Sequence, residues 1–250
     1  MTVEAYIPGT QKGEAYEALF EMMREHDLGK SYADMIRLRL SGGVADTCRD
    51  TYYVAREGKK ALARLWTGWG THEDAIGNWG NFFTDEEHRG KGIGAALLTL
   101  WLSDFEGRSD LPLCLLCSAG TKELTDLYGR FGFRPAIEGT DHGGLYLPLG
   151  KSPASFRSFY REYYTPSPVL YHRRATVGYR HEIDCLLRFA LRDLGVSFGI
   201  GEMNSVEAAL LYHAHRCGML FSTDGHCVGW SMDGVRQVYP LYEESSVVEA

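Results

Sequence analysis

The spacing of hydrophobic and polar positions predicts strands and helices that follow one another along the first 150 residues. Strict alternation is typical of a half-buried strand, a repeat of three to four residues of an amphipathic helix, and a short unbroken apolar run of a strand buried on both faces. By these patterns the chain has, in order, a strand at 2–7, a helix from 15 to near Gly29, a short helix at 35–40, a hairpin at 51–66, a strand at 75–84, a helix at 93–105, a strand at 111–117, a short helix at 124–131 and a closing hairpin at 133–149. This order predicts a mixed α/β (α+β) fold with a central, largely antiparallel sheet flanked by helices.

The strand predicted at 75–84 contains two glycines, Gly77 and Gly80. Glycine inside a strand marks a bulge, a close approach by a ligand or another backbone, or a tightly packed position. The sequence leaves these readings open.

The last 100 residues repeat part of this pattern. The run 150–168 is rich in proline and aromatic residues and is expected to be a packed connector. The elements expected after it are a helix with an apolar stripe from Ile183 through Leu191 to Leu194, a strand at 196–200, a helix capped by Asn204, three strand-like runs at 219–221, 227–230 and 235–241, and a frayed tail at 245–250. We therefore expect two domains, 1–150 and 151–250. The second is a smaller α/β region, either a degenerate copy of half the first fold or an unrelated cap or dimerisation segment.

Composition narrows the class of protein. With 250 residues and 44% hydrophobic residues, the chain can bury a sizeable core. The net charge of −7 disfavours nonspecific nucleic-acid binding and fits a cationic partner. No basic-then-apolar leader and no apolar run of about 20 residues is present, so a cytoplasmic protein without membrane association is expected. The six cysteines, Cys114 and Cys117 among them, lie in apolar stretches and are expected to be reduced and packed as small hydrophobic residues.

A glycine-rich run lies between a predicted strand and a predicted helix, where Gly90, Gly92 and Gly94 alternate with other residues. Glycine permits unusual dihedrals and leaves main-chain amides uncovered. Amides at a helix N-terminus favour negative charge, and Arg89 and Lys91 add positive charge at the same place. The run therefore predicts a pyrophosphate-binding turn.

The spacing of this turn matches neither a nucleoside triphosphate loop nor the Gly-x-Gly-x-x-Gly of a dinucleotide fold. It resembles the Arg/Gln-x-x-Gly-x-Gly/Ala signature of the GNAT superfamily of acyl-CoA-dependent N-acyltransferases, with Arg89, Gly92 and Gly94 on the fixed positions. The block 127–135 resembles that family's downstream helix-to-strand segment. The resemblance covers roughly residues 1–150.

The resemblance implies transfer of an acetyl group from acetyl-CoA, a cosubstrate, to a primary amine of a small molecule or peptide by direct attack in a ternary complex. It implies that Tyr128 is the catalytic residue that protonates the departing thiolate. Where many members have an asparagine this chain has Thr121, which departs from the family pattern. The positions implied for coenzyme A binding are Phe82, Phe83, Thr84, Arg89, Gly90, Lys91, Gly92, Ile93, Gly94 and Thr121.

The residue that accepts the amine's proton stays open in the sequence. The candidates are Glu73, Asp74, Asp85, Glu86, Glu87, Asp141 and His142, and a water chain to a distant carboxylate would serve equally well. His213 and His215 are two apart on a predicted helix and face different sides, so no metal is expected. A non-catalytic acyl-CoA sensor or assembly module is the alternative to the enzyme. Whether the chain acts alone or as a homodimer is left open.

Overall fold

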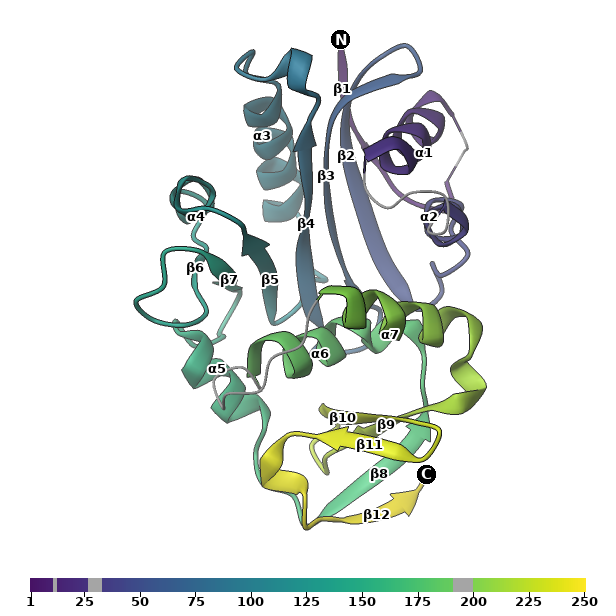
Figure 1. The fold of residues 1–250 in the computed structure, drawn as a ribbon. Coiled ribbons are helices and arrows are strands. Elements are labelled where there is room, and N and C mark those ends of the chain that lie inside the picture. The colour runs from purple at the N-terminus through teal and green to yellow at the C-terminus, as the bar shows by residue number, and fades with distance from the viewer. Residues whose placement is uncertain (11–12, 27–32, 191–199) are drawn as a thin grey trace. The chain divides into compact units, whose positions relative to one another are not determined.

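A computed structural model describes residues 1–10, 13–26, 33–190 and 200–250 of the chain (Figure 1). Within them the chain forms two compact units, and each is described by itself. The first unit comprises Met1–Gly68 and Trp79–Leu111, and the second comprises Trp69–Asn78 and Pro112–Ala250. These units group residues by spatial proximity. The predicted domains 1–150 and 151–250 stay a prediction.

The first unit is a sheet of long strands with helices on both faces. Its elements are β1 (Thr2–Tyr6), α1 (Glu14–His26), α2 (Ala33–Leu40), β2 (Cys48–Glu57), β3 (Lys60–Gly70), β4 (Ile76–Thr84), the 3-10 turn η2 (Glu86–His88) and α3 (Ile93–Glu106), of which β3 ends and β4 begins in the second unit. Figure 1 shows α1 and α2 on one side of β1–β3 and α3 on the other. β1 pairs antiparallel with β2, from Thr2 opposite Arg56 to Tyr6 opposite Tyr52.

The apolar stripe of α1 explains why this helix forms and where it packs. Ala15, Leu19, Met22 and Met23 recur at helical spacing and are all buried, in one cluster with residues of α2, β1, β2 and β3. Burying a leucine or methionine side chain contributes about 1.5–3 kcal/mol. Packing of this stripe, more than helix propensity, therefore holds α1 on the sheet.

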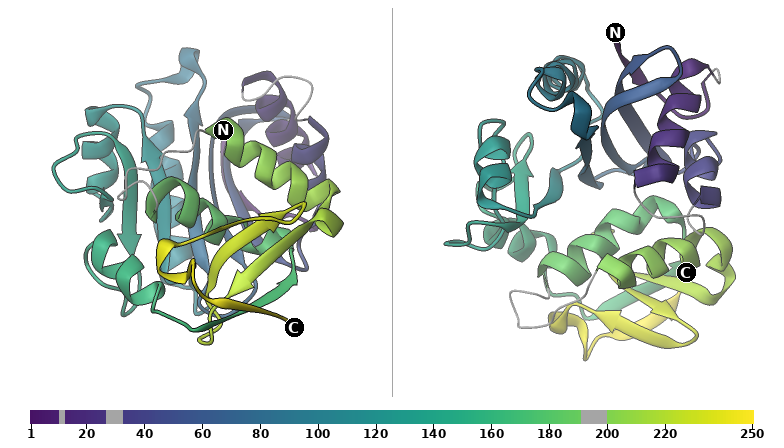
Figure 2. Two further views of the ribbon diagram at one scale, coloured as in Figure 1. Left: turned by 60° about the horizontal axis from the view of Figure 1, so that its bottom comes forward. Right: turned by 45° about the horizontal axis from the view of Figure 1, so that its top comes forward.

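The second unit contains the rest of the first sheet and all of a second one. Its elements are β5 (Cys114–Ala119), α4 (Lys122–Gly129), β6 (Arg134–Pro135), β7 (Gly143–Pro148), α5 (Phe156–Tyr163), β8 (Val169–Arg174), η3 (Val177–Tyr179), α6 (Arg180–Asp184), the π-helical segment η4 (Cys185–Ala190), α7 (Ile200–Tyr212), η6 (Ala214–Arg216), β9 (Cys217–Phe221), β10 (Cys227–Met232), β11 (Val235–Val238), η7 (Pro240–Tyr242) and β12 (Ser246–Glu249). Figure 2 shows α6 and α7 on one face of the second sheet.

The hydrogen-bonded strand orders are β1-β2-β3-β4-β5-β7-β6 in the first sheet and β11-β10-β9-β8-β12 in the second. Pairing is parallel between β4 and β5 and between β12 and β8, and antiparallel in the β1–β2, β5–β7, β6–β7, β8–β9, β9–β10 and β10–β11 pairs. The predicted mixed α/β fold with a largely antiparallel central sheet, flanking helices and a further C-terminal α/β region is confirmed. All six cysteines are free and buried, as predicted.

Three C-terminal predictions were wrong. The helix expected to be capped by Asn204 begins earlier, at Ile200, so Asn204 lies inside α7. The connector expected at 150–168 contains a helix, α5, whose cap Ser155 accepts a hydrogen bond from the Ser158 amide (3.2 Å). The tail expected to be frayed contains β12, which pairs in parallel with β8. The predicted end of the first helix near Gly29, the helical positions Leu191 and Leu194, and the predicted strand at 196–199 lie outside the described residues.

Two kinds of feature are absent from the described part of the chain. No helix there has the length and apolar character that crossing a membrane requires. No group of three or more histidine, cysteine or carboxylate side chains there is arranged to hold a metal ion.

Candidate functional site

The glycine-rich turn leaves β4 at Thr84, passes through η2 and enters α3. Gly90 and Gly92 have φ values of +74° and +78°, in the left-handed region where residues with a Cβ are strained. A Cβ built on either glycine would meet no atom within 4 Å. Glycine is therefore required at these two positions by backbone conformation, and the space beside the turn is open.

The N-terminus of α3 offers main-chain donors to a ligand. Gly92 is its N-cap and supplies no side-chain cap, and the first turn carries no acidic residue. The Ala96 amide donates to the Gly92 carbonyl (3.0 Å), so the amides of residues 93–95 precede the first intrahelical bond. Uncapped amides at the positive end of a helix dipole favour a phosphate or another anion.

Gly94, the third glycine of the turn, is small for a different reason. A Cβ there would lie 3.0 Å from Cζ of Phe82 and 3.6 Å from Oγ1 of Thr84. The end of β4 therefore packs directly against the first turn of α3, and this contact fixes where the amides of the helix begin.

Arg89 ties the turn to the strand that precedes it. Its Nε donates to the Thr84 carbonyl (3.1 Å), and its guanidinium lies 5.9 Å from the centre of the Phe83 ring. An exposed ion pair with Glu86 (3.5 Å) adds little to stability. Arg89 thus orders the turn and brings positive charge to it, while Lys91 is exposed beside it.

The second set of predicted site residues lies on α4, in the second unit. Thr121 is the N-cap of α4, and its Oγ1 accepts a hydrogen bond from the Leu124 amide (3.3 Å). Tyr128 is buried in the last turn, with its ring 6.3 Å from that of Phe133. Burial, with a smaller contribution from Cys117 of β5, raises the pKa of Tyr128 to about 12. Its phenol therefore stays protonated at neutral pH.

The acetyltransferase (GNAT) domain model matches residues 48–135 of this chain. Residues 48–135 form a GNAT segment. The segment runs from β2 to β6 and includes both the glycine-rich turn and α4. The model describes an acetyltransferase domain, a kind of domain that transfers acyl groups from acyl-CoA.

The solved structures that match this chain do so at low sequence identity. They include Escherichia coli ElaA, at 16% identity over 59% of this chain and 99% of that one with a TM-score of 0.44. An acyl-CoA N-acyltransferase from Pseudomonas aeruginosa has 21% identity over 58% and 99%, with a TM-score of 0.43. PH1933 from Pyrococcus horikoshii OT3 has 18% identity over 60% and 99%, with a TM-score of 0.40. No curated protein matches the sequence.

The two glycines predicted to lie in one strand, Gly77 and Gly80, have different surroundings in β4. Gly77 is a packing position, because a Cβ there would lie 2.6 Å from Cδ2 of Leu115 on β5. Gly80 is open, and the next residue, Asn81, has a φ of +50°, an irregular conformation for a strand. Sequence reasoning missed Asn81. The signal was the Gly-Asn pair, since asparagine tolerates the left-handed region better than other residues with a side chain.

Two of the candidate bases are poorly suited to that role. Partial burial by itself would raise the pKa of Asp85, but the Glu87 amide and the charges of Lys60 and His88 outweigh it, and the pKa is lowered. The hydrogen bond from His142 likewise lowers the pKa of Asp141. A carboxylate with a lowered pKa is a weaker base, so neither is favoured as the acceptor of the amine's proton.

Proposed function

We propose that this chain transfers an acetyl group from acetyl-CoA to a primary amine, on a small molecule or a peptide, by direct attack in a ternary complex. The observation that carries the proposal is the uncapped N-terminus of α3, approached through two left-handed glycines, within a GNAT segment. The amides of residues 92–95 and the charges of Arg89 and Lys91 would bind the pyrophosphate of the cosubstrate.

The proposed chemistry asks little of the protein's side chains. The amine nitrogen attacks the thioester carbonyl, a C–N bond forms, the C–S bond breaks, the nitrogen loses a proton and the thiolate gains one. We assign the proton given to the thiolate to Tyr128, because a phenol whose pKa is raised by burial still carries its proton at neutral pH when the C–S bond breaks. Main-chain amides at the end of β4, over residues 82–84, would polarise the acyl carbonyl.

Binding is tested by the thermal midpoint of unfolding. A ligand that binds only the folded chain at 100 times its Kd stabilises it by about 2.7 kcal/mol. For a chain of this size that corresponds to a rise of roughly 5–10 °C. Gly92→Glu should abolish the rise, because it places a carboxylate and a side chain where the phosphates would lie.

A matched control separates loss of binding from backbone strain. Gly234, in the turn between β10 and β11, has a φ of +80° against +78° for Gly92, and a Cβ on it would also meet nothing within 4 Å. Gly234→Glu should therefore lower the midpoint of the free protein as much as Gly92→Glu does, yet keep the rise with acetyl-CoA. An unchanged midpoint of the wild-type chain at millimolar acetyl-CoA would refute the proposal. Binding without release of thiol over a broad panel of amines would instead identify a non-catalytic acyl-CoA module.

A further inference from the structure

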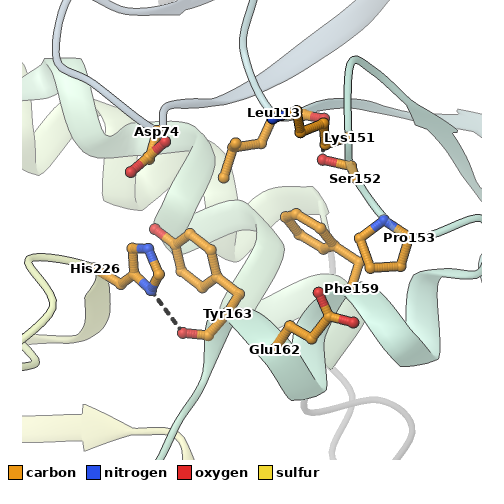
Figure 3. Close-up of a pocket in the computed structure, with 9 residues that line it drawn as sticks. All are labelled: Asp74, Leu113, Lys151, Ser152, Pro153, Phe159, Glu162, Tyr163 and His226. Carbon is orange, nitrogen blue, oxygen red and sulfur yellow. Dashed lines mark hydrogen bonds between the residues drawn. The ribbon is translucent and has the colours of Figure 1, made fainter.

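The second unit contains a cavity of about 320 Å³, within the size range of small-molecule sites. Figure 3 shows the side chains that line it. Its floor is aromatic, since Phe159 and Tyr163 of α5 are 3% and 4% exposed. Its rim is charged and exposed, with Asp74, Glu162 and Lys151. An apolar floor with a few polar groups at the edge is the usual construction of a site for a small organic molecule.

His226 forms one wall and is held in a single orientation. Its ring stacks on that of Tyr163, with centroids 4.2 Å apart and planes 11° apart. Its Nδ1 lies 2.8 Å from the main-chain carbonyl oxygen of Tyr163. A carbonyl oxygen only accepts, so Nδ1 carries the proton, and in the neutral ring Nε2 is an acceptor. Figure 3 shows the opposite edge of the ring on the side of the cavity where Asp74 lies.

The charges on the rim favour a cation. Asp74 and Glu162 bring two carboxylates, Lys151 brings one ammonium group, and the ring nitrogen Nε2 of His226 is not the one that donates to the Tyr163 carbonyl. Among the described residues, neither carboxylate has an ion-pair partner. Asp74 also has a φ of +53°, a conformation that residues with a Cβ rarely adopt and that recurs at ligand-binding positions.

We propose that this cavity binds a small organic ammonium ion with an apolar body. The body lies on the rings of Phe159 and Tyr163, and the N–H groups of the cation donate to Asp74, Glu162 and Nε2 of His226. The site stands on residues of the second unit alone. It does not rest on the proposed acyl transfer.

The probe is phenethylammonium, a primary ammonium ion on an aromatic body, added to the full chain without acetyl-CoA. Binding is followed by titration calorimetry and by the amide shifts of an isotope-labelled sample, and a Kd on the order of 1 mM or tighter is expected for a ligand of this size. The comparison probes are 3-phenylpropionate, an anion of the same shape, and phenylalanine, a zwitterion. We expect the anion to bind at least tenfold more weakly. A Kd for phenylalanine within a few-fold of that for phenethylammonium would indicate that its carboxylate contacts Lys151, while its ammonium group occupies the same site.

Asp74→Asn is the decisive variant because it removes the charge and keeps the shape, and asparagine is well tolerated at a positive φ. It should raise the Kd for phenethylammonium about tenfold, the loss of one charge-assisted hydrogen bond. Glu244→Gln, which neutralises an exposed carboxylate outside the cavity, should leave the Kd unchanged. Leu113→Trp, which fills the cavity from its half-buried wall without changing any charge, should abolish binding.

Three results would overturn the proposal: no saturable shift with millimolar phenethylammonium, equal binding of 3-phenylpropionate, or an unchanged Kd in Asp74→Asn. The Gly92→Glu variant distinguishes failure of this proposal from failure of the proposed acyl transfer. It should lose the response to acetyl-CoA and bind phenethylammonium like the wild-type chain, so either proposal can fail while the other stands.

Discussion

The two glycines of β4 offer a test of packing in which the same substitution should have opposite effects three residues apart. At Gly77 an added Cβ would lie 2.6 Å from Cδ2 of Leu115, 2.9 Å from Cγ of Pro112 and 3.2 Å from the Cys114 carbonyl oxygen. Leu115 is fully buried and the ring of Pro112 is rigid, so neither moves aside easily. At Gly80 an added Cβ would meet nothing within 4 Å.

Gly77→Ala should therefore destabilise the chain by about 1–3 kcal/mol, the usual cost of forcing an extra carbon into a packed interior. That corresponds to a fall in the thermal midpoint of roughly 2–12 °C for a chain of this length. Gly80→Ala loses no packing and removes unfolded-chain freedom, which stabilises by about 0.4–1 kcal/mol where the backbone fits. Its midpoint should stay level or rise by roughly 1–4 °C.

The assay is thermal unfolding of the two variants and the wild type, followed by circular dichroism and repeated as urea unfolding. Since both residues lie on one strand, a general intolerance of that strand to alanine would lower both midpoints alike. Equal effects at Gly77 and Gly80, or a Gly77→Ala variant as stable as the wild type, would refute the packing argument.

Three further predictions concern caps, charges and the proposed proton donor. Thr121→Ala should cost about 1 kcal/mol by removing the cap of α4, while Thr121→Ser keeps it, as urea unfolding would show. The hydrogen bond from Arg108 holds the pKa of Asp110 below its ordinary value, so the stability that it contributes is present above about pH 4 and lost as the pH falls through the lowered value. Asp110→Asn should consequently narrow the difference in urea midpoint between pH 7 and pH 3, and an undiminished difference would contradict the assignment. Tyr128→Phe should lower kcat with little change in the Kd of acetyl-CoA, and equal turnover by the variant would remove its assigned role.

The first 150 residues could be predicted from the sequence because their signals are local. The apolar stripe of α1 repeats every three to four residues. The turn before α3 is indicated by glycines, whose left-handed dihedrals few other residues adopt. The segment that forms α5 also has helical periodicity, but the nearby prolines favoured the prediction of a connector. Its buried rings, Phe156, Phe159, Tyr160 and Tyr163, have helical spacing, and Ser155 stands at the cap position. Prolines outside both ends of a helix delimit it and do not exclude it.

The α6 segment shows what local patterns do not reveal. Its five residues, Arg180–Asp184, are all buried although four of them are polar or charged. Glu182 accepts hydrogen bonds from the Ile76 amide (2.8 Å) and lies 3.0 Å from Nε2 of His72, and Asp184 accepts one from Asn78 (2.9 Å). Buried carboxylates persist only where such partners satisfy them. The partners are more than 100 positions away in the sequence. From hydrophobic periodicity alone, these polar residues would therefore be assigned to the exposed face of a helix.

This difference bears on the two proposed sites. The glycine-rich turn consists of consecutive residues, so the chemistry proposed for it could be inferred from residue types and their order alone. The ammonium cavity joins Asp74 before β4, α5 and His226 beside β10, and Asp74 entered the sequence reading only as one of several acids. Nothing in the local sequence of His226 indicates that its Nδ1 proton is committed to a carbonyl of another element, which is the contact that makes Nε2 an acceptor. Substitutions in the turn should therefore act through the residue replaced. The effects of substitutions around the cavity should depend on contacts between distant segments. A variant that loosens α5 would therefore weaken ammonium binding even though it leaves unchanged the groups that accept hydrogen bonds from the cation.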